Sequence, residues 1–172
     1  MSQLNVNTIG ARTGNNITLA SGDNFYIPGH ILQVVQGTYA TETATTSSSY
    51  VDTGLSVNIT PSATSSKILV ITTHHTHFNR SFDYGGGYIK VLRDSTSIDE
   101  IREWMQVGTG SYVAVGRTVV STVLDSPSTT SQITYKSQFK VHYAANSESF
   151  KVAYDSANQD VVDTLTVLEV GG

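Results

Sequence analysis

Hydrophobic and polar residues alternate along most of this chain, and the alternation is clearest over residues 132–143 (QITYKSQFKVHY). The period of two predicts a strand in which one face carries Ile133, Tyr135, Phe139, Val141 and Tyr143. The opposite face carries Thr134, Lys136, Gln138, Lys140 and His142. One buried face and one wet face are typical of strands in antiparallel sheets.

The same period predicts strands over much of the remaining chain. They are expected at 30–40, 55–60, 67–78, 87–92, 112–115, 116–124, 149–155 and 164–170. Residues 97–105 fit both alternation and one face of a helix, so we interpret them as a strand or a short helical turn. The linker 125–131 is predicted to join its two neighbouring strands as a hairpin.

These elements predict an all-β chain, with an antiparallel, jelly-roll-like β-sandwich over residues 29–172. Residues 1–28 hold two short alternating pieces that are too poor in large apolar side chains to form a core. We interpret 1–28 as an extended arm that needs a partner surface, such as identical copies of the chain. The alternative is a disordered tail.

The composition of the chain argues against several classes of function. Charged residues make up 14% of the 172 residues, the net charge is −4, and the Lys and Arg residues are scattered singly. Nucleic-acid binding needs concentrated positive charge, so we expect no nucleic-acid partner. There are no cysteines, which excludes disulfides and thiolate chemistry. We also expect no signal peptide and no membrane insertion, because the N-terminus lacks the required pattern and no window approaches 18 apolar residues.

Several short segments carry a resemblance to a known class of protein. The N-terminus has an "S-x-L-x-V-N-T-I" stretch with Leu4, Val6, Asn7, Thr8 and Ile9, and a "T-G-x-x-I-x-L-x-x-G" stretch over 13–22. The body adds SKILVI (66–71), FNR (78–80), VLRDSTSI (91–98), LDSPST (124–129) and LTVLEV (165–170). In this order the pieces resemble small structural proteins of tailed bacteriophages, especially phages of marine bacteria and cyanobacteria.

The resemblance implies a virion protein that forms homotrimers and is made in the host cytoplasm. Its arm, through Leu4, Val6, Asn7, Thr8 and Ile9, would attach to other virion proteins of the tail or capsid. Its β domain would act as a short tail fibre or tip and contact a host-surface glycan or protein. A capsid decoration or head-fibre protein is the alternative, and a carbohydrate-binding module is a further one.

Three of the five histidines lie within residues 74–77. On a strand His75 and His77 share one face and His74 points the other way. A pair is too few for a stable metal site, so iron or zinc would require both histidines to face a threefold axis, as in some phage spikes. Otherwise no cofactor is expected. The competing interpretation is a polar stretch of a strand that lost its buried face after Ile71, at a wet surface or a subunit contact. A pH-sensitive contact stays open.

Aromatic residues and glycines suggest one binding surface. Gly85, Gly86 and Gly87 are predicted to form a flexible tip, with Phe82, Tyr84 and Tyr88 beside it. These aromatic side chains could contact a receptor or partner, or could pack on the chain's own sheet. The only tryptophan, Trp104, is expected in the core or at an interface.

Catalytic and calcium-binding patterns are weak. There is no G-x-S-x-G or H-E-x-x-H motif and no convincing carboxylate pair, so we expect no enzymatic activity. Asp155, Asn158 and Asp160 fit a solvated turn better than a calcium loop, which needs further oxygen ligands.

Overall fold

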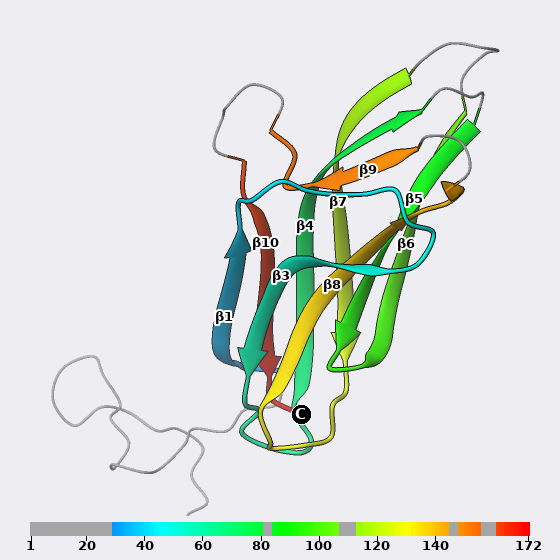
Figure 1. The fold of residues 1–172 in the computed structure, drawn as a ribbon. Coiled ribbons are helices and arrows are strands. Elements are labelled where there is room, and N and C mark those ends of the chain that lie inside the picture. The colour runs from blue at the N-terminus through cyan, green and yellow to red at the C-terminus, as the bar shows by residue number, and fades with distance from the viewer. Residues whose placement is uncertain (1–28, 81–83, 107–112, 145–147, 156–160) are drawn as a thin grey trace, which may run out of the picture.

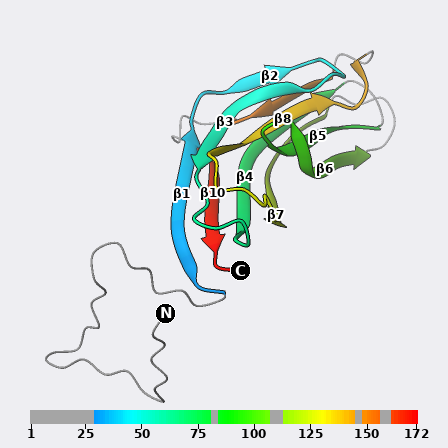
Figure 2. The same cartoon turned by 90° about the horizontal axis from the view of Figure 1, so that it is seen from below.

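Two antiparallel sheets, packed face to face, make up the described part of the molecule (Figure 1 and Figure 2). The computed structural model describes residues 29–80, 84–106, 113–144, 148–155 and 161–172. Those residues contain ten strands. They contain no helix long and apolar enough to cross a membrane. The prediction of an all-β sandwich is confirmed, whereas residues 1–28, with Leu4, Val6, Asn7, Thr8 and Ile9, lie outside the described part.

The first sheet is built around the longest strand, β4. Its members are β1 (Ile31–Tyr39), β10 (Asp163–Val170), β4 (Lys67–Arg80), β7 (Val113–Asp125), and the short strands β9 (Ser149–Val152) and β2 (Thr43–Thr45). The second sheet has the order β3 (Val51–Ile59), β8 (Ile133–Val141), β5 (Tyr84–Arg93), β6 (Thr96–Gln106). Residues 97–105 therefore lie in a strand, the first of the two interpretations of that segment.

The strand order is that of a jelly roll. Without the short β2 and β9, the two sheets read β1-β10-β4-β7 and β3-β8-β5-β6. Eight long strands in this order form the two Greek keys of that fold. The chain thus alternates between sheets at several connections, and the first and last long strands, β1 and β10, pair along their length.

Alternation positions the core between the sheets. Along β8 every second side chain is buried, from Ile133 to Val141, as the pattern predicts. One cluster of buried residues surrounds Tyr135, toward the end of the sandwich where β1, β4 and β8 begin, which we call its foot. A second cluster surrounds Phe139 and Phe150. Tyr143, expected on the buried face, is 42% exposed because β8 ends at Val141.

The link between β7 and β8 differs from the prediction. Residues 125–131 do not close a hairpin, because β7 pairs with β4 and β8 pairs with β3 and β5. The turn residues instead carry the chain from one sheet to the other. A polar set spans the sheets there: Arg93 donates two hydrogen bonds of 2.7 Å to Asp125, which also accepts one from the Tyr135 hydroxyl. Burial, followed by this bond, raises the pKa of Tyr135.

The three glycines predicted as a flexible tip lie inside β5 and are buried. A side chain at Gly86 would collide with the carbonyl oxygen of Glu103 on the neighbouring strand. A Cβ at Gly87 would lie 2.4 Å from the ring of Phe150, which comes from β9 in the opposite sheet. Gly87 therefore provides space for an aromatic ring between the sheets and Gly86 allows the close approach of β6, which local sequence could not indicate.

We predict that Gly87→Ala lowers the free energy of unfolding by about 1–3 kcal/mol, because the added methyl group overpacks the core against Phe150. Gly116→Ala is the matched control, since its Cβ would meet its nearest atom, the Thr76 carbonyl oxygen, at an ordinary 3.6 Å. Chemical denaturation monitored through Trp104 measures both changes. Equal stability of the two variants would contradict the role assigned to Gly87.

Candidate functional site

The outer face of the first sheet carries a row of apolar side chains across its four long strands, and its outward positions farther along β10, β4 and β7 are largely Thr and His. Its register places Val34 beside Leu168, Leu168 beside Leu69, and Leu69 beside Leu124. Val34 and Leu124, at the two ends of this row, are 58% and 59% exposed. Ile31 and Val120 are half-exposed as well, so four of the seven large exposed hydrophobic residues in the described part lie here.

This surface, which we call the apolar face, carries little charge. Among the described outward-facing side chains of β1, β10, β4 and β7, the one Lys, Arg, Asp or Glu is Lys67, at the foot of β4. Its Nζ atom donates a hydrogen bond of 2.9 Å to the Ser126 hydroxyl. An exposed apolar sheet surface of this kind marks a contact site more often than a solvated surface.

The outer face of the second sheet has a different chemistry. Aromatic rings and cations alternate across its strands, and we name this set the aromatic–basic face. It consists of Tyr50, Tyr88, Lys90, Arg102, Trp104, Lys140 and His142. These residues come from β5, β6, β8, the end of β8 and the residue before β3, so only the strand order brings them together.

Pairing across β5 explains the arrangement. Tyr88 lies between Arg102 on β6 and Lys140 on β8, its two cross-strand partners. The Lys140 ammonium is 4.7 Å from the centre of the Tyr88 ring and 4.6 Å from that of Tyr50. The Arg102 guanidinium lies 4.3 Å from the Trp104 ring centre. These distances are those of cation–π contacts.

Lys90 and Glu100 complete one end of the face. The Lys90 ammonium lies 3.6 Å from the centre of the Tyr50 ring, and 4.0 Å from the Glu100 carboxylate. The Tyr50 hydroxyl donates a hydrogen bond of 2.6 Å to the same carboxylate. Burial and this bond raise the pKa of Tyr50, so the phenol stays protonated. Three cations therefore share one carboxylate in this set, on a chain whose net charge is −4.

His142 completes the other end. Its Nδ1 atom is 3.0 Å from the Tyr88 hydroxyl, and its ring contacts the rings of Trp104 and Tyr143 at 5.4 Å and 4.0 Å between centres. Burial, then the charges of Arg102 and Lys140, lower the pKa of His142 below its ordinary value of 6.5. The imidazole is therefore neutral near pH 7, and the three cations carry the positive charge.

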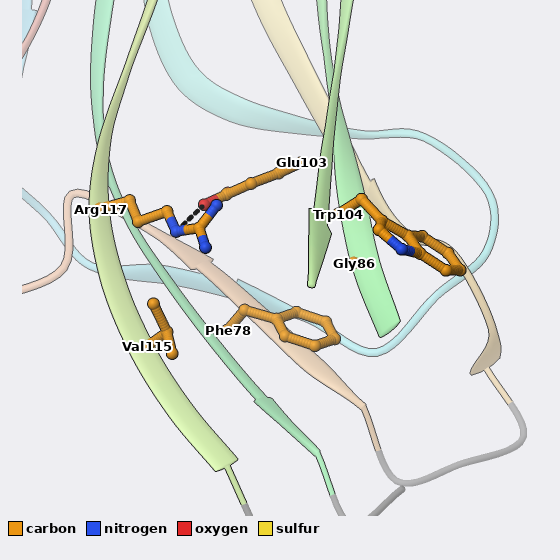
Figure 3. Close-up of a pocket in the computed structure, with 6 residues that line it drawn as sticks. All are labelled: Phe78, Gly86, Glu103, Trp104, Val115 and Arg117. Carbon is orange, nitrogen blue, oxygen red and sulfur yellow. Dashed lines mark ion pairs between the residues drawn. The ribbon is translucent and has the colours of Figure 1, made fainter. Parts of the chain in front are cut away.

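Trp104 and its neighbour Glu103 point to opposite sides of β6 (Figure 3). Trp104 is 38% exposed on the aromatic–basic face, so of the two positions expected for it, core or interface, the core is excluded and the interface stays a prediction. Glu103 points between the sheets, where it accepts a hydrogen bond of 3.1 Å from Thr76 and lies 3.9 Å from Arg117. Burial raises its pKa above the usual range, against the effect of those two partners. The cavity beside it holds about 10 Å³, at most one water molecule.

The predicted contact residues are divided by the structure. Tyr88 lies at the centre of the aromatic–basic face. Tyr84 opens β5, but its side chain is not among those described, and Phe82 lies outside the described residues. Sequence reasoning missed Tyr50, Lys90, Arg102, Lys140 and His142. The alternation of 132–143 had placed Lys140 and His142 on one wet face, which is the signal that could have found them.

His75 and His77 lie on the outer surface of β4 and line an open recess of about 520 Å³ with Arg117, Thr118 and Tyr154. The His77 ring stacks on Tyr154, with 4.1 Å between ring centres. No group of three or more His, Asp or Glu side chains in the described part is placed to hold a metal ion. Iron or zinc shared on a threefold axis stays a prediction. Asn158 and Asp160 lie outside the described residues.

His74 corrects the interpretation that β4 loses its buried face after Ile71. Its side chain is fully buried, and the inward positions of β4 continue through Thr72, His74 and Thr76 to Phe78. The His74 Nδ1 atom lies 2.7 Å from the carboxylate of buried Asp163, at the start of β10. A polar partner 89 residues away therefore replaces apolar packing at this position.

Asp163 connects three segments of the first sheet. Its carboxylate accepts hydrogen bonds from the backbone N–H groups of His75 (2.7 Å) and Ala153 (3.0 Å), in addition to His74. It also lies 3.2 Å from the His75 Nδ1 atom. A buried carboxylate is stable only with several donors of this kind. Asp163 thus fixes His75 and the segment after β9 at the recess.

We predict that Asp163→Asn lowers the free energy of unfolding by about 2–3 kcal/mol, because the amide nitrogen cannot accept the bonds that one carboxylate oxygen accepts. Asp52→Asn is the control. Asp52 is largely exposed and binds Lys136 and Gln138 at the surface, so we expect a change below about 1 kcal/mol. Thermal and urea unfolding measure the difference, and similar losses for both variants would refute the assignment.

Comparison with known proteins finds only weak structural similarity. No protein-family model matches the chain, and no curated protein sequence matches it significantly. Two solved structures with weak similarity are those of infectious bursal disease virus, strains Gx and Gt. The first is 13% identical over 81% of this chain and 37% of the other, with a TM-score of 0.29. The second is 15% identical over 91% and 42%, with a TM-score of 0.31. The chain spans less than half of either matched protein.

Proposed function

We propose that this chain is a structural protein of a tailed-phage virion, a short homotrimeric tail fibre or tip that binds the host surface. The observation that carries the proposal is the contrast between the two outer faces of one sandwich. One face carries an apolar row and is nearly uncharged, and this row suits permanent contact with other copies. The opposite face presents aromatic rings and cations, residue types that are enriched at recognition surfaces.

The position of the chain ends supports this arrangement. The Gly29 N–H group donates a hydrogen bond of 2.7 Å to the Gly171 carbonyl, so residue 29 lies at the foot of the sandwich beside the end of β10. The aromatic–basic face lies toward the other end, where β5 begins and β6 and β8 end. An arm that starts at the foot would hold the domain with its recognition surface away from the particle.

The extent and the low charge of the apolar face support self-association of the chain. Four strands about 4.8 Å apart and seven residue steps of about 3.4 Å give a footprint of roughly 450 Å². Copies with a net charge of −4 repel one another least across a surface that lacks carboxylates. Because a standard interface covers about 800 Å² per partner, we propose that the arm, residues 1–28, supplies further contacts. Three binding faces per trimer would then add avidity to weak single contacts.

A binding role also suits the small space beside the polar groups that lie between the sheets. The polar groups between the sheets are hydrogen-bonded to one another beside a cavity of one water molecule at most. We therefore propose a protein without enzymatic activity, located in the virion. The resemblance of its first 22 residues to tailed-phage proteins favours a virion protein over a secreted carbohydrate-binding module, and a capsid decoration or head-fibre protein is the alternative to the tail position.

We predict that the protein is a trimer and that Val34→Glu with Leu124→Glu converts it to monomers, because six carboxylates would meet at the buried faces. Light scattering during size-exclusion chromatography, over a hundredfold range of concentration, measures the mass. Thr96→Glu, an exposed substitution on the second sheet, is the control and should leave the mass unchanged. A monomeric wild-type protein at every concentration would contradict the proposed trimer.

Removal of residues 1–28 tests the anchor. We expect the truncated chain to keep a cooperative unfolding transition, because the core lies between residues 29 and 172, and to be lost from assembled particles. Immunoblotting of purified virions measures incorporation against the full-length protein. Normal incorporation of the truncated chain would exclude the arm as the attachment segment. The copy number per particle distinguishes tail from capsid: a few trimers indicate a tail position, and tens to hundreds indicate the capsid.

A further inference from the structure

We propose that the aromatic–basic face binds an acidic polysaccharide, in which carboxylate or phosphate groups meet the cations while the sugar rings lie against the aromatic side chains. This inference rests on the proposed function, since it names the ligand class for the same host-binding surface. Three independent features of the face lead to it: its charge, the spacing of its cations and its shape.

Charge comes first. Lys90, Arg102 and Lys140 share this outer face with two carboxylates, those of Glu100 and Asp52, and Asp52 is paired with a further cation, Lys136. The face is therefore positive, whereas the chain as a whole carries a net charge of −4. A positive surface on a negative protein attracts an anionic ligand to one place and repels it elsewhere. A neutral glycan would gain nothing from three cations, which would then have to be desolvated without compensation.

The second feature is the spacing of the cations on this face. Arg102 and Lys140 pair with Tyr88 from opposite sides, so their Cα atoms lie two strand spacings apart, roughly 10 Å. Both charged groups lie near the Tyr88 ring, at 5.7 and 4.7 Å from its centre, and the Arg102 guanidinium is also 4.3 Å from the centre of the Trp104 ring. The Lys90 ammonium lies over the Tyr50 ring instead, so the three cations are distributed along the face. A polymer with repeated negative groups can engage several of them, and the Tyr88 and Trp104 rings between and beside the cations offer apolar surface for the sugar units that separate those groups.

Shape comes third. The face is the surface of a four-stranded sheet, and its rings come from successive strands and the segment before β3. A polymer can run across such an open surface and contact several strands. Nucleic acid fits the face less well, because its binding depends on neutralising many phosphates and this set provides three cations. Those cations are partly held by Glu100 and by ring contacts.

The test uses the full-length protein and four immobilised polymers. Polygalacturonate carries carboxylates, a glycerol-phosphate teichoic acid carries phosphates, dextran is neutral, and single-stranded DNA is a non-carbohydrate polyanion. We expect at least one of the two acidic glycans to bind about tenfold more tightly than dextran and DNA. We also expect that binding to weaken when NaCl rises from 50 to 500 mM, because screening shortens the reach of the cations. The better of the two acidic polymers identifies the anionic group.

Variants locate the site. Arg102→Gln with Lys140→Gln should lower the affinity for the acidic glycan at least tenfold, and Trp104→Ala should lower it for every glycan that binds. Lys151→Gln removes a charge from the first sheet, outside the aromatic–basic face, and should change the affinity less than twofold. Circular dichroism and the trimer mass establish that each variant is folded.

Any of the following results would contradict the inference. Equal binding of dextran would exclude acidic recognition, and if it depended on Trp104 the proposed host-binding face would stand. Equal binding of DNA would indicate unspecific attraction of polyanions. Acidic binding that survives the Arg102 and Lys140 changes would place the site elsewhere. Binding of neither acidic glycan would leave the trimer and anchor results as the separate tests of the proposed function.

Discussion

Burial of the two inner sheet faces against each other is the interaction on which the rest of this structure depends. Once alternate side chains of each strand are committed to the core, the remaining ones must face outward, and each sheet acquires a second surface. In a sandwich those two surfaces point in opposite directions. The chain uses that geometry to keep an apolar surface and an aromatic–basic surface apart, with the shared core between them.

Hydrogen bonds between polar side chains of the two sheets add to the contacts of the apolar core. Asp125 holds Arg93 and Tyr135, Asp99 accepts a hydrogen bond from Ser121, and Glu103 accepts one from Thr76. These pairs lie along β5 and β6 on one sheet and β4 and β7 on the other. Because each bridge joins strands that are not hydrogen-bonded neighbours, it specifies how the sheets align as well as how strongly they pack.

The sequence predicted the fold class because period-two burial is a local property. Residues 132–143 show their buried and exposed faces within twelve positions, and the structure reproduces this pattern from Ile133 to Val141. The errors share one cause, since each needed knowledge of a distant residue. Gly87 is a glycine because of Phe150, and His74 is buried because of Asp163. The turn after Asp125 looks like a hairpin until the two strands are assigned to different sheets.

The candidate site was harder to predict than the fold for the same reason. Tyr88 could be singled out as an aromatic residue near glycines, but its neighbours Arg102 and Lys140 lie 14 and 52 positions away in the sequence. Single cations scattered along a chain gave no local signal of a positive surface. They form one only after strand pairing places them side by side, which is why a composition argument against clustered charge did not reveal it.

The rings beneath the cations have a further consequence. Lysine and arginine side chains lose much rotational freedom when a ligand fixes them, and that loss opposes binding. Here Lys90 lies over the Tyr50 ring, Lys140 over the rings of Tyr50 and Tyr88, and Arg102 over the Trp104 ring within the fold itself. Much of the ordering therefore accompanies folding instead of recognition. The face is thus preorganised, so three modest charges can contribute more to affinity than the same charges on unsupported side chains.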